Sequence, residues 1–369
     1  MLQSLHAAWG ARRVLLLGGE DRMTRFMRAL LGELGARPAC LPLSSGSEAL
    51  SRTLTGGRVC CVIVPCLRDL RGSLDEQLHA LDALLIEARE AGVPLVMLLS
   101  DENVYRAVQR PWTVREEDPI GGETREGLFH AILQLFADGV SRGLLGDPVH
   151  VLCIRHLPCL GCGHPAVAPY DAWCRALDAG EPLTVPHPGA QGIFLHPLDV
   201  CMGGLLLGAR FLLGDTACTG MFNLDAGARN LMPGRTAALC LCARCGHARA
   251  LEETEPPHPV LLPLLDGSRA RRLCGAHPVI PGEEALLDLL SLERARQKGA
   301  DALEEEVQAQ TAAFLARFLT EGALGRLSER RTSSALRAPS PEGKADLLRS
   351  CLTALPSPMG KVAERSEVG

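Results

Sequence analysis

The sequence has 369 residues, of which 47% are hydrophobic, and it carries a formal net charge of -5. Such a chain can bury one large core or two, and the acidic balance without basic stripes argues against a nucleic-acid partner. No apolar run reaches the roughly 18 residues needed to cross a membrane, and the VLLLGG stretch near the N-terminus is too short for a signal-peptide core. We therefore expect a soluble, cytoplasmic protein with no membrane partner.

Strands and helices alternate in the first part of the chain. Short apolar runs typical of buried strands lie at 11–19, 59–65, 93–100 and 149–155. Between these runs, apolar residues recur at the three- to four-residue spacing of a helix, at 21–38, 73–92 and 127–145. Gly35 is expected to end the first of these helices, and Ser73 with Glu76 forms a capping box at the start of the second. This alternation predicts an α/β fold with a Rossmann-type doubly wound parallel sheet, whose core covers 11–155.

The second part of the chain has shorter segments, rich in Pro and Gly. Helical patterns lie at 169–180, 197–214, 233–246 and 282–318. They predict a smaller C-terminal substrate lobe over 156–328, with some elements interleaved with the core. The stretch 329–369 is polar and rich in Ser, Pro and charge, so we expect a disordered tail with at most a short helix at 344–354.

In a short secreted chain, fifteen cysteines would indicate a disulfide framework. This chain is long and shows no signal-peptide core, so we expect reduced thiols. Several lie in apolar runs, where a free thiol behaves as a small hydrophobic group: Cys60, Cys61, Cys153, Cys201 and Cys240. CLGCGH (159–164) and CARCGH (242–247) have a spacing compatible with zinc. Because chance pairs are expected among so many cysteines, the sequence favours no metal site.

Five collinear stretches resemble one known family. The most specific is LLPLLDGSRARRLCGAHPVIPGEEALLDLL (261–290), which is similar to the closing segment of nucleotide-sugar 4,6-dehydratases and epimerases, the extended short-chain dehydrogenase/reductases. The pattern is kept at Asp266, Ser268, Ala270, Gly275 and Pro278, with Arg269 in place of a Lys. The other four stretches are SDENVYRAVQRPWTVREEDPIGG (100–122), IRHLPCLGCGH (154–164), GEPLTVPHPGAQGIFLHPLDVCMGGLLLGARFL (180–212) and MFNLDAG (221–227). Within 100–122, REEDPIGG resembles the CDP-glucose 4,6-dehydratase branch.

The resemblance implies a dinucleotide cofactor, but the glycine turn departs from the pattern. Three glycines should let the backbone turn tightly, approach the pyrophosphate and pack the helix on the sheet. Gly18 fits the first position and Gly19 follows it, whereas Asp21 and Thr24 fall on the second and third. A carboxylate there repels phosphates, and a side chain blocks their approach. We expect no cofactor, with NAD(P) bound only if the enzyme is active.

The resemblance also implies a Tyr-x-x-x-Lys pair, and Glu126 and His130 stand at its positions. Neither replaces a phenol or a permanent cation. The two residues are four apart on a predicted helix, so they are an acid–base dyad or an ordinary polar pair on a solvated face, and the sequence favours the second. Asp101 and Glu102, at the end of the strand at 93–100, match the acid–base residues of the dehydratases.

Among the substrate contacts that the resemblance implies, Arg155 and His196 are kept. Two functions therefore compete. The favoured one is a degenerate family member without redox activity that binds a nucleotide sugar or a protein partner, as a homodimer like others of the family. The alternative is an active NAD(P)-dependent 4,6-dehydratase or epimerase with a site rebuilt around Asp101, Glu102, Glu126 and His130.

Overall fold

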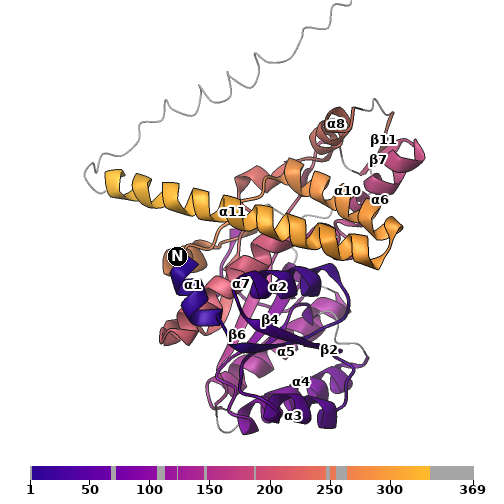
Figure 1. The fold of residues 1–369 in the computed structure, drawn as a ribbon. Coiled ribbons are helices and arrows are strands. Elements are labelled where there is room, and N and C mark those ends of the chain that lie inside the picture. The colour runs from indigo at the N-terminus through magenta and orange to yellow at the C-terminus, as the bar shows by residue number, and fades with distance from the viewer. Residues whose placement is uncertain are drawn as a thin grey trace, which may run out of the picture. The chain divides into compact units, whose positions relative to one another are not determined.

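The computed structural model describes residues 2–67, 72–105, 113–122, 124–144, 148–186, 188–246, 250–254 and 264–332, with side chains as far as residue 320. The chain divides into two compact units, Met1–Gly322 and Ala323–Gly369. All strands and almost all helices of Figure 1 belong to the first unit.

Six strands form the central sheet in the order β2-β1-β3-β4-β6-β9, and every pairing is parallel. Their bounds are β1 Arg13–Leu17, β2 Arg37–Leu41, β3 Val59–Val64, β4 Val96–Asp101, β6 Val151–His156 and β9 Gly220–Leu224. The chain leaves β1 toward β2 on one side and returns to β3 on the other. This switch opens a crevice at the carboxyl ends of β1 and β3, where doubly wound folds bind ligands. The predicted fold class is confirmed.

Helices cover both faces of the sheet, which explains why its strands are continuous apolar runs. One face packs against α1 (Leu2–Trp9), α2 (Arg22–Glu33) and α7 (Pro197–Leu212), and the other against α3 (Ser47–Thr55), α4 (Leu74–Glu90) and α5 (Arg125–Ser141) (Figure 1). Along β1, Val14 and Leu16 join the first core cluster, and Leu15 and Leu17 join the second. This alternation follows from the two-residue period of a strand.

The remaining helices are α6 Ala168–Ala179, α8 Gly234–Arg244, α9 Ser268–Cys274, α10 Gly282–Lys298 and the long α11 Ala300–Thr332. Three pairs of short strands lie outside the central sheet. The strand pairs are β7 Leu183–Pro186 with β11 Leu251–Thr254, β8 Gln191–Ile193 with β10 Leu231–Pro233, and β5 Thr113–Val114 with β12 Leu264–Leu265. Single turns of 3₁₀ helix lie at η2 Glu102–Val104, η3 Thr216–Cys218 and η4 Ala228–Asn230.

The structure corrects several predicted boundaries. The helical region predicted at 282–318 is two helices, because Gly299 takes a left-handed backbone (φ 123°) that ends α10. Helix α11 runs to Thr332, so the first residues of the predicted tail are helical. Helices α1 and α3 and strand β2 were not predicted. The remaining tail, the short helix at 344–354, and residues 145 and 261–263 lie outside the described residues.

Candidate functional site at the sheet crossover

The turn after β1 is closed by its own side chains. Asp21 is the N-cap of α2, and its Oδ1 accepts a hydrogen bond from the Thr24 backbone N–H at 3.0 Å. The Thr24 hydroxyl donates to Asp21 Oδ2 at 2.6 Å. A Cβ added to Gly18 would lie 2.6 Å from that hydroxyl, so only glycine fits there, while Gly19 faces open space.

This arrangement places a fixed negative charge at the positive end of α2. In parallel α/β folds of this kind, a pyrophosphate binds at the N-terminus of the helix that follows β1, which is α2 here. Free backbone N–H groups and the helix dipole hold it there. Here Asp21 uses one of those N–H groups and the dipole for itself. A bound diphosphate would have to displace the cap and bring its own charge beside the carboxylate.

The cavity at the crossover is small. It has a volume of about 60 Å³ and lies among the ends of β1, β3, β4 and β6. Its polar and sulfur-bearing lining consists of Asp21, Met23, Cys66, Ser100, Asp101, His156, Cys159, Cys162 and His164. Pockets for drug-sized ligands and cofactors typically measure about 300–1,000 Å³, so this space suits a few water molecules rather than a dinucleotide.

Asp101 and Glu102, the two carboxylates predicted at the end of β4, are both buried, with 3% and 1% of their surface exposed. Asp101 Oδ1 accepts from the Asn103 backbone N–H at 3.2 Å and lies 3.6 Å from His130 Nδ1. Glu102 Oε1 lies 3.6 Å from His164 Nε2. Each predicted carboxylate therefore faces a buried histidine, which is an arrangement able to hold and transfer a proton.

The structure separates Glu126 from His130, the pair that the sequence placed on one solvated face. Glu126 is exposed in the first turn of α5, but His130 is 2% exposed and faces Asp101. Gly127 makes this possible, because a Cβ there would collide with the Asn103 carbonyl oxygen. The first turn of α5 thus lies directly against η2, and this close approach turns His130 inward. The expected solvated face is wrong for His130.

Arg155 is part of a buried hydrogen-bond network. Its Nε donates to Gln134 Oε1 at 2.8 Å, and one Nη1 hydrogen donates to the Tyr105 hydroxyl at 2.6 Å. Gln134 in turn donates to Ser100, and Tyr105 to Asn223 Oδ1 at 2.9 Å. The guanidinium also lies over the Tyr105 ring, 4.9 Å from its centroid. These contacts tie β4, α5, β6 and β9 together, so Arg155 is a structural group rather than an open substrate contact.

His196 caps α7. Its Nδ1 accepts from the Leu198 backbone N–H at 3.0 Å, so the ring's proton is on Nε2, which lies 3.8 Å from Asp288 Oδ2. The side chain is 1% exposed, and this burial lowers the pKa of His196 to about 3. The role of a neutral, buried helix cap accounts for a histidine at position 196 without any contact to a sugar.

Neither tyrosine is placed for proton transfer to a ligand. Tyr105 is held in the Arg155 network, and Tyr170 packs edge-on against Trp173 with ring centroids 5.0 Å apart. Burial raises the pKa of both phenols. Only three lysines occur in the chain, Lys298, Lys344 and Lys361. Of these, only Lys298 lies in the described part, in the last turn of α10.

Zinc ligation finds no geometric support in the described part of the chain, where no group of three or more His, Cys, Asp or Glu side chains could hold a metal ion. His247 of the second Cys-x-x-Cys-Gly-His motif lies outside that part. In the first motif, burial raises the pKa of the Cys159 and Cys162 thiols well above the ordinary value, which makes the thiolate form unfavourable.

Sequence reasoning missed His164 as a partner of Glu102. Its position at the end of CLGCGH suggested a metal ligand instead, whereas its Nδ1 accepts from the Ala166 backbone N–H at 3.1 Å and its Nε2 lies 3.1 Å from Asn103 Nδ2. Its position in the chain could have indicated this role. The loop that follows β6 starts at the carboxyl end of that strand, beside the carboxyl end of β4, where Glu102 lies.

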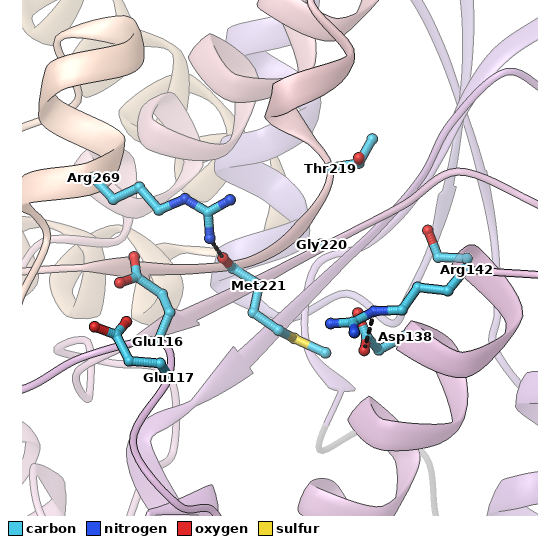
Figure 2. A pocket seen from close by; sticks show the side chains of 9 residues that line it. Glu116, Glu117, Asp138, Arg142, Thr219, Gly220, Met221 and Arg269 are labelled. Carbon is cyan, nitrogen blue, oxygen red and sulfur yellow. Dashed lines mark hydrogen bonds and ion pairs between the residues drawn. The ribbon is translucent and has the colours of Figure 1, made fainter.

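A larger hollow of about 390 Å³ lies beside the edge strand β9. Figure 2 shows Arg269 on one side of Met221 and the Arg142–Asp138 pair on the other. Arg269 donates to the Met221 carbonyl at 2.9 Å and lies over the Phe222 ring, and Glu116 accepts from the Asn223 backbone N–H at 3.0 Å. These side chains satisfy the outward backbone groups of β9, which protects the sheet edge against pairing with another strand.

Comparisons with known proteins give a likeness in fold. No protein-family profile and no curated protein matches the sequence. A UDP-glucose 4-epimerase from Stenotrophomonas maltophila, solved with NAD and formylated UDP-arabinopyranose, superposes with a TM-score of 0.64 at 15% identity over 78% of this chain and 100% of its own. A dTDP-glucose 4,6-dehydratase from Streptomyces venezuelae, solved with NAD, gives 0.60 at 17% identity over 79% and 99%. An epimerase from Methanothermobacter thermautotrophicus gives 0.64 at 16% identity over 81% and 98%.

These superpositions show that the chain has the fold of nucleotide-sugar dehydratases and epimerases. Each neighbour is matched over almost its full length, while about a fifth of this chain lies outside each match. Within the described residues, no helix is both long and apolar enough to span a membrane.

Proposed function

We propose that this protein is a degenerate member of the NAD-dependent epimerase/dehydratase family that has lost dinucleotide redox chemistry and acts by binding a ligand or a partner protein. The fold and the five collinear stretches support membership of the family. A nucleotide sugar is the ligand that the family resemblance implies, and nucleotide-sugar or polysaccharide metabolism is the corresponding setting.

The observation that carries this proposal is the Asp21 cap. The carboxylate occupies the helix N-terminus on which a pyrophosphate would rest, and Thr24 is bonded to it from the third glycine position. Bound NAD would supply hydride transfer, but the residues present at this turn do not fit its pyrophosphate.

The catalytic positions support the same conclusion. Glu126 and His130 replace the Tyr and Lys, and the two tyrosines of the chain are buried in other roles. The cofactor turn and the proton relay are unrelated in structure, so their joint loss is hard to reconcile with a working oxidoreductase.

An acid–base enzyme remains the second candidate, because of the two buried histidine–carboxylate pairs, Asp101 with His130 and Glu102 with His164. In this alternative, the site is rebuilt around Asp101, Glu102, Glu126 and His130, with NAD(P) bound at the crossover, but Glu126 is exposed in the first turn of α5. The small cavity and the Asp21 cap make it the weaker of the two.

We propose a homodimer through α5, and two exposed leucines on that helix support it. Leu128 and Leu135 are 45% and 58% exposed on one stripe of that helix. In an antiparallel pairing of two copies, Leu128 of each would face Leu135 of the other. Such a self-complementary patch is what an isologous two-fold contact needs. We expect Leu135→Arg to convert a dimer to a monomer in analytical ultracentrifugation; a wild-type monomer would disprove the contact.

We place the protein in the cytoplasm, in agreement with the buried free thiols of Cys61, Cys153 and Cys218.

A thermal-shift series tests the proposed function. NAD⁺ and NADP⁺ at about 1 mM should leave the melting temperature unchanged, because a ligand stabilises only a state that binds it. CDP-, dTDP- and UDP-glucose at the same concentration should raise it for whichever nucleotide the lobe accepts. A clear rise with a nicotinamide dinucleotide, matched by turnover of a nucleotide sugar, would establish the enzyme instead. A flat response to every nucleotide sugar would remove the ligand from the proposal and leave the protein partner.

A further inference from the structure

The loop after β6 contains a tight turn with a cysteine at each end. The Cys162 backbone N–H donates to the Cys159 carbonyl at 3.3 Å, and Gly161, the third residue of the turn, has a left-handed backbone (φ 74°). These are features of a type II β-turn, in which the first and fourth Cα atoms lie less than about 7 Å apart. A disulfide spans Cα separations of about 4.4–6.8 Å. The turn therefore holds the two cysteines close to the separation that a disulfide needs.

The two thiols also lie on the same side of this turn. Cys159 and Cys162 both line the cavity of about 60 Å³ at the sheet crossover. Burial, followed by the charge of a Cys162 thiolate, raises the pKa of Cys159, so the two sulfur atoms are near enough to interact. A common orientation is the second requirement of a disulfide, because side chains that point apart cannot be bridged.

The surroundings of the turn hold its backbone in place. The Leu160 N–H donates to the Leu195 carbonyl at 3.0 Å, and the Gly161 N–H donates to Asp171 Oδ1 at 2.8 Å. Arg22 lies over Gly161, where an added Cβ would collide with the guanidinium. The two ends of the turn therefore keep this spacing in the folded protein.

The two cysteines differ in their exposure. Cys162 is partly exposed, whereas only 1% of the Cys159 surface is exposed. A reagent in solution therefore reaches Cys162 first, and Cys159 is placed to react with its neighbour. Burial raises the pKa of both thiols, so thiol–disulfide exchange is slow near neutral pH and becomes faster as the pH rises.

The second Cys-x-x-Cys sequence has the same spacing but a different geometry. Cys242 lies in α8 and Cys245 is the C-cap of that helix, with its N–H donating to the Leu241 carbonyl. Residues three apart on a helix have Cβ atoms about 5–6 Å apart. A disulfide needs Cβ atoms about 3.5–4.5 Å apart, so the helical pair is poorly placed to form one.

We propose that Cys159 and Cys162 form a dithiol site that small disulfides oxidise to an intramolecular disulfide. The Cys162 sulfur attacks one sulfur of the reagent and forms a mixed disulfide, and half of the reagent leaves as a thiol. The Cys159 sulfur then attacks the Cys162 sulfur, and the other half leaves as a thiol. The two protein thiols lose two electrons and two protons, which reduce the reagent to two thiols. The site does not depend on whether a dinucleotide or a nucleotide sugar binds at the crossover.

Incubation of the reduced full chain with oxidised glutathione at pH 8.5 tests the site. The remaining thiols are then blocked in acid, and peptide mass spectrometry with fragment ions locates each modification. We expect Cys159 and Cys162 together to lose two hydrogen atoms without gaining glutathione. About tenfold less bridged form is expected for Cys242 and Cys245, because of their helical geometry. Cys40 is exposed and should carry glutathione, which shows that the reagent is active.

Three variants separate the roles of the thiols. Cys159→Ser should retain glutathione on Cys162, because no second thiol can displace it. Cys162→Ser should leave Cys159 unmodified, because Cys159 is buried. Cys66→Ser removes a third thiol that lines the same cavity and is the matched control, which should form the bridge as the wild type does. Melting temperatures show whether each variant is folded.

Three results would overturn the proposal. In the first, the folded wild type has a modified Cys40 but keeps the Cys162 thiol, or carries glutathione on Cys162 without closing the bridge. In the second, Cys66→Ser abolishes the bridge, which would make Cys66 the partner of Cys162. In the third, Cys242 and Cys245 form a bridge as readily as the pair in the turn.

Discussion

The sheet crossover and the α10–α11 groove both collect charged side chains, but they differ in how those charges are satisfied. At the crossover the polar groups bind one another: Asp21 caps α2, and Arg155 connects Gln134 to Tyr105. In the groove of about 270 Å³ between α10 and α11, the carboxylates of Glu284, Asp288 and Glu306 outnumber the single guanidinium of Arg317. Burial raises the pKa of Asp288 there to about 6. The first pattern is that of polar groups which satisfy one another, and the second is that of negative charge held at a cost.

The largest effect is expected for Arg155→Met, which tests whether the polar groups at the crossover stabilise the fold. It leaves the buried Gln134 oxygen and Tyr105 hydroxyl without their partner, so we expect a loss of about 3 kcal/mol in the free energy of unfolding. Urea denaturation measures it. Arg115→Met, an exposed arginine of the same region, is the control and should cost less than about 0.5 kcal/mol. A change below about 1 kcal/mol for Arg155→Met would return Arg155 to the role of a substrate contact.

The second test concerns pH. Because the folded pKa of His196 is about 3 and its unfolded value is 6.5, the unfolded state takes up a proton first as the pH falls. Stability linked to this residue is complete above pH 6.5 and is lost between there and pH 3, by up to about 1.4 kcal/mol per pH unit. His196→Asn keeps a capping side chain and should flatten this slope in denaturation measured from pH 7 to pH 4.5.

Asp288 opposes this effect in the same range. Its folded pKa of about 6 lies above the unfolded value of 3.8, so its contribution is present below pH 3.8 and is lost as the pH rises through 6. The difference between wild type and His196→Asn isolates the histidine. An unchanged slope in the variant would show that His196 is charged in the folded protein, and the cap would have been misassigned.

The smallest expected effect belongs to the turn. Asp21→Ala removes the N-cap of α2 and should cost about 1 kcal/mol, whereas Asp21→Asn keeps the acceptor and loses only a few tenths of a kcal/mol from the helix dipole. Chemical denaturation of the two variants side by side distinguishes these amounts. If Asp21→Ala were more stable than wild type, the carboxylate would be strained rather than capping.

Much of the fold could be predicted from the sequence, and the reason is burial on both faces. Strands such as β3 and β4 are continuous apolar runs, and the Ser73–Glu76 capping box lies where it was predicted. Strand β2 was missed because it is only partly buried at the sheet edge, and α3 because it is a short helix of nine residues. The break at Gly299 was missed because the apolar pattern continues on both sides of it.

The candidate site was less predictable, since it depends on whether each side chain points into the protein or toward solvent. The four-residue spacing of Glu126 and His130 could not show that Gly127 brings one end of α5 against η2 and buries His130. Arg155 and His196 matched family positions, but their hydrogen bonds are with groups distant in the sequence or made at a helix cap. The glycine turn was easier to analyse, because its three positions are close in the sequence and a bound pyrophosphate needs glycine at each of them.

Titration of NAD⁺ into the wild-type protein and into an Asp21→Gly/Thr24→Gly variant tests the central claim most directly. We predict no measurable heat for the wild type at about 1 mM NAD⁺, since its anion-binding helix end is already occupied by its own carboxylate. The variant frees that end, and any binding that appears should appear there alone. Saturable binding to the wild type, not improved by the two glycines, would contradict the loss of the cofactor site.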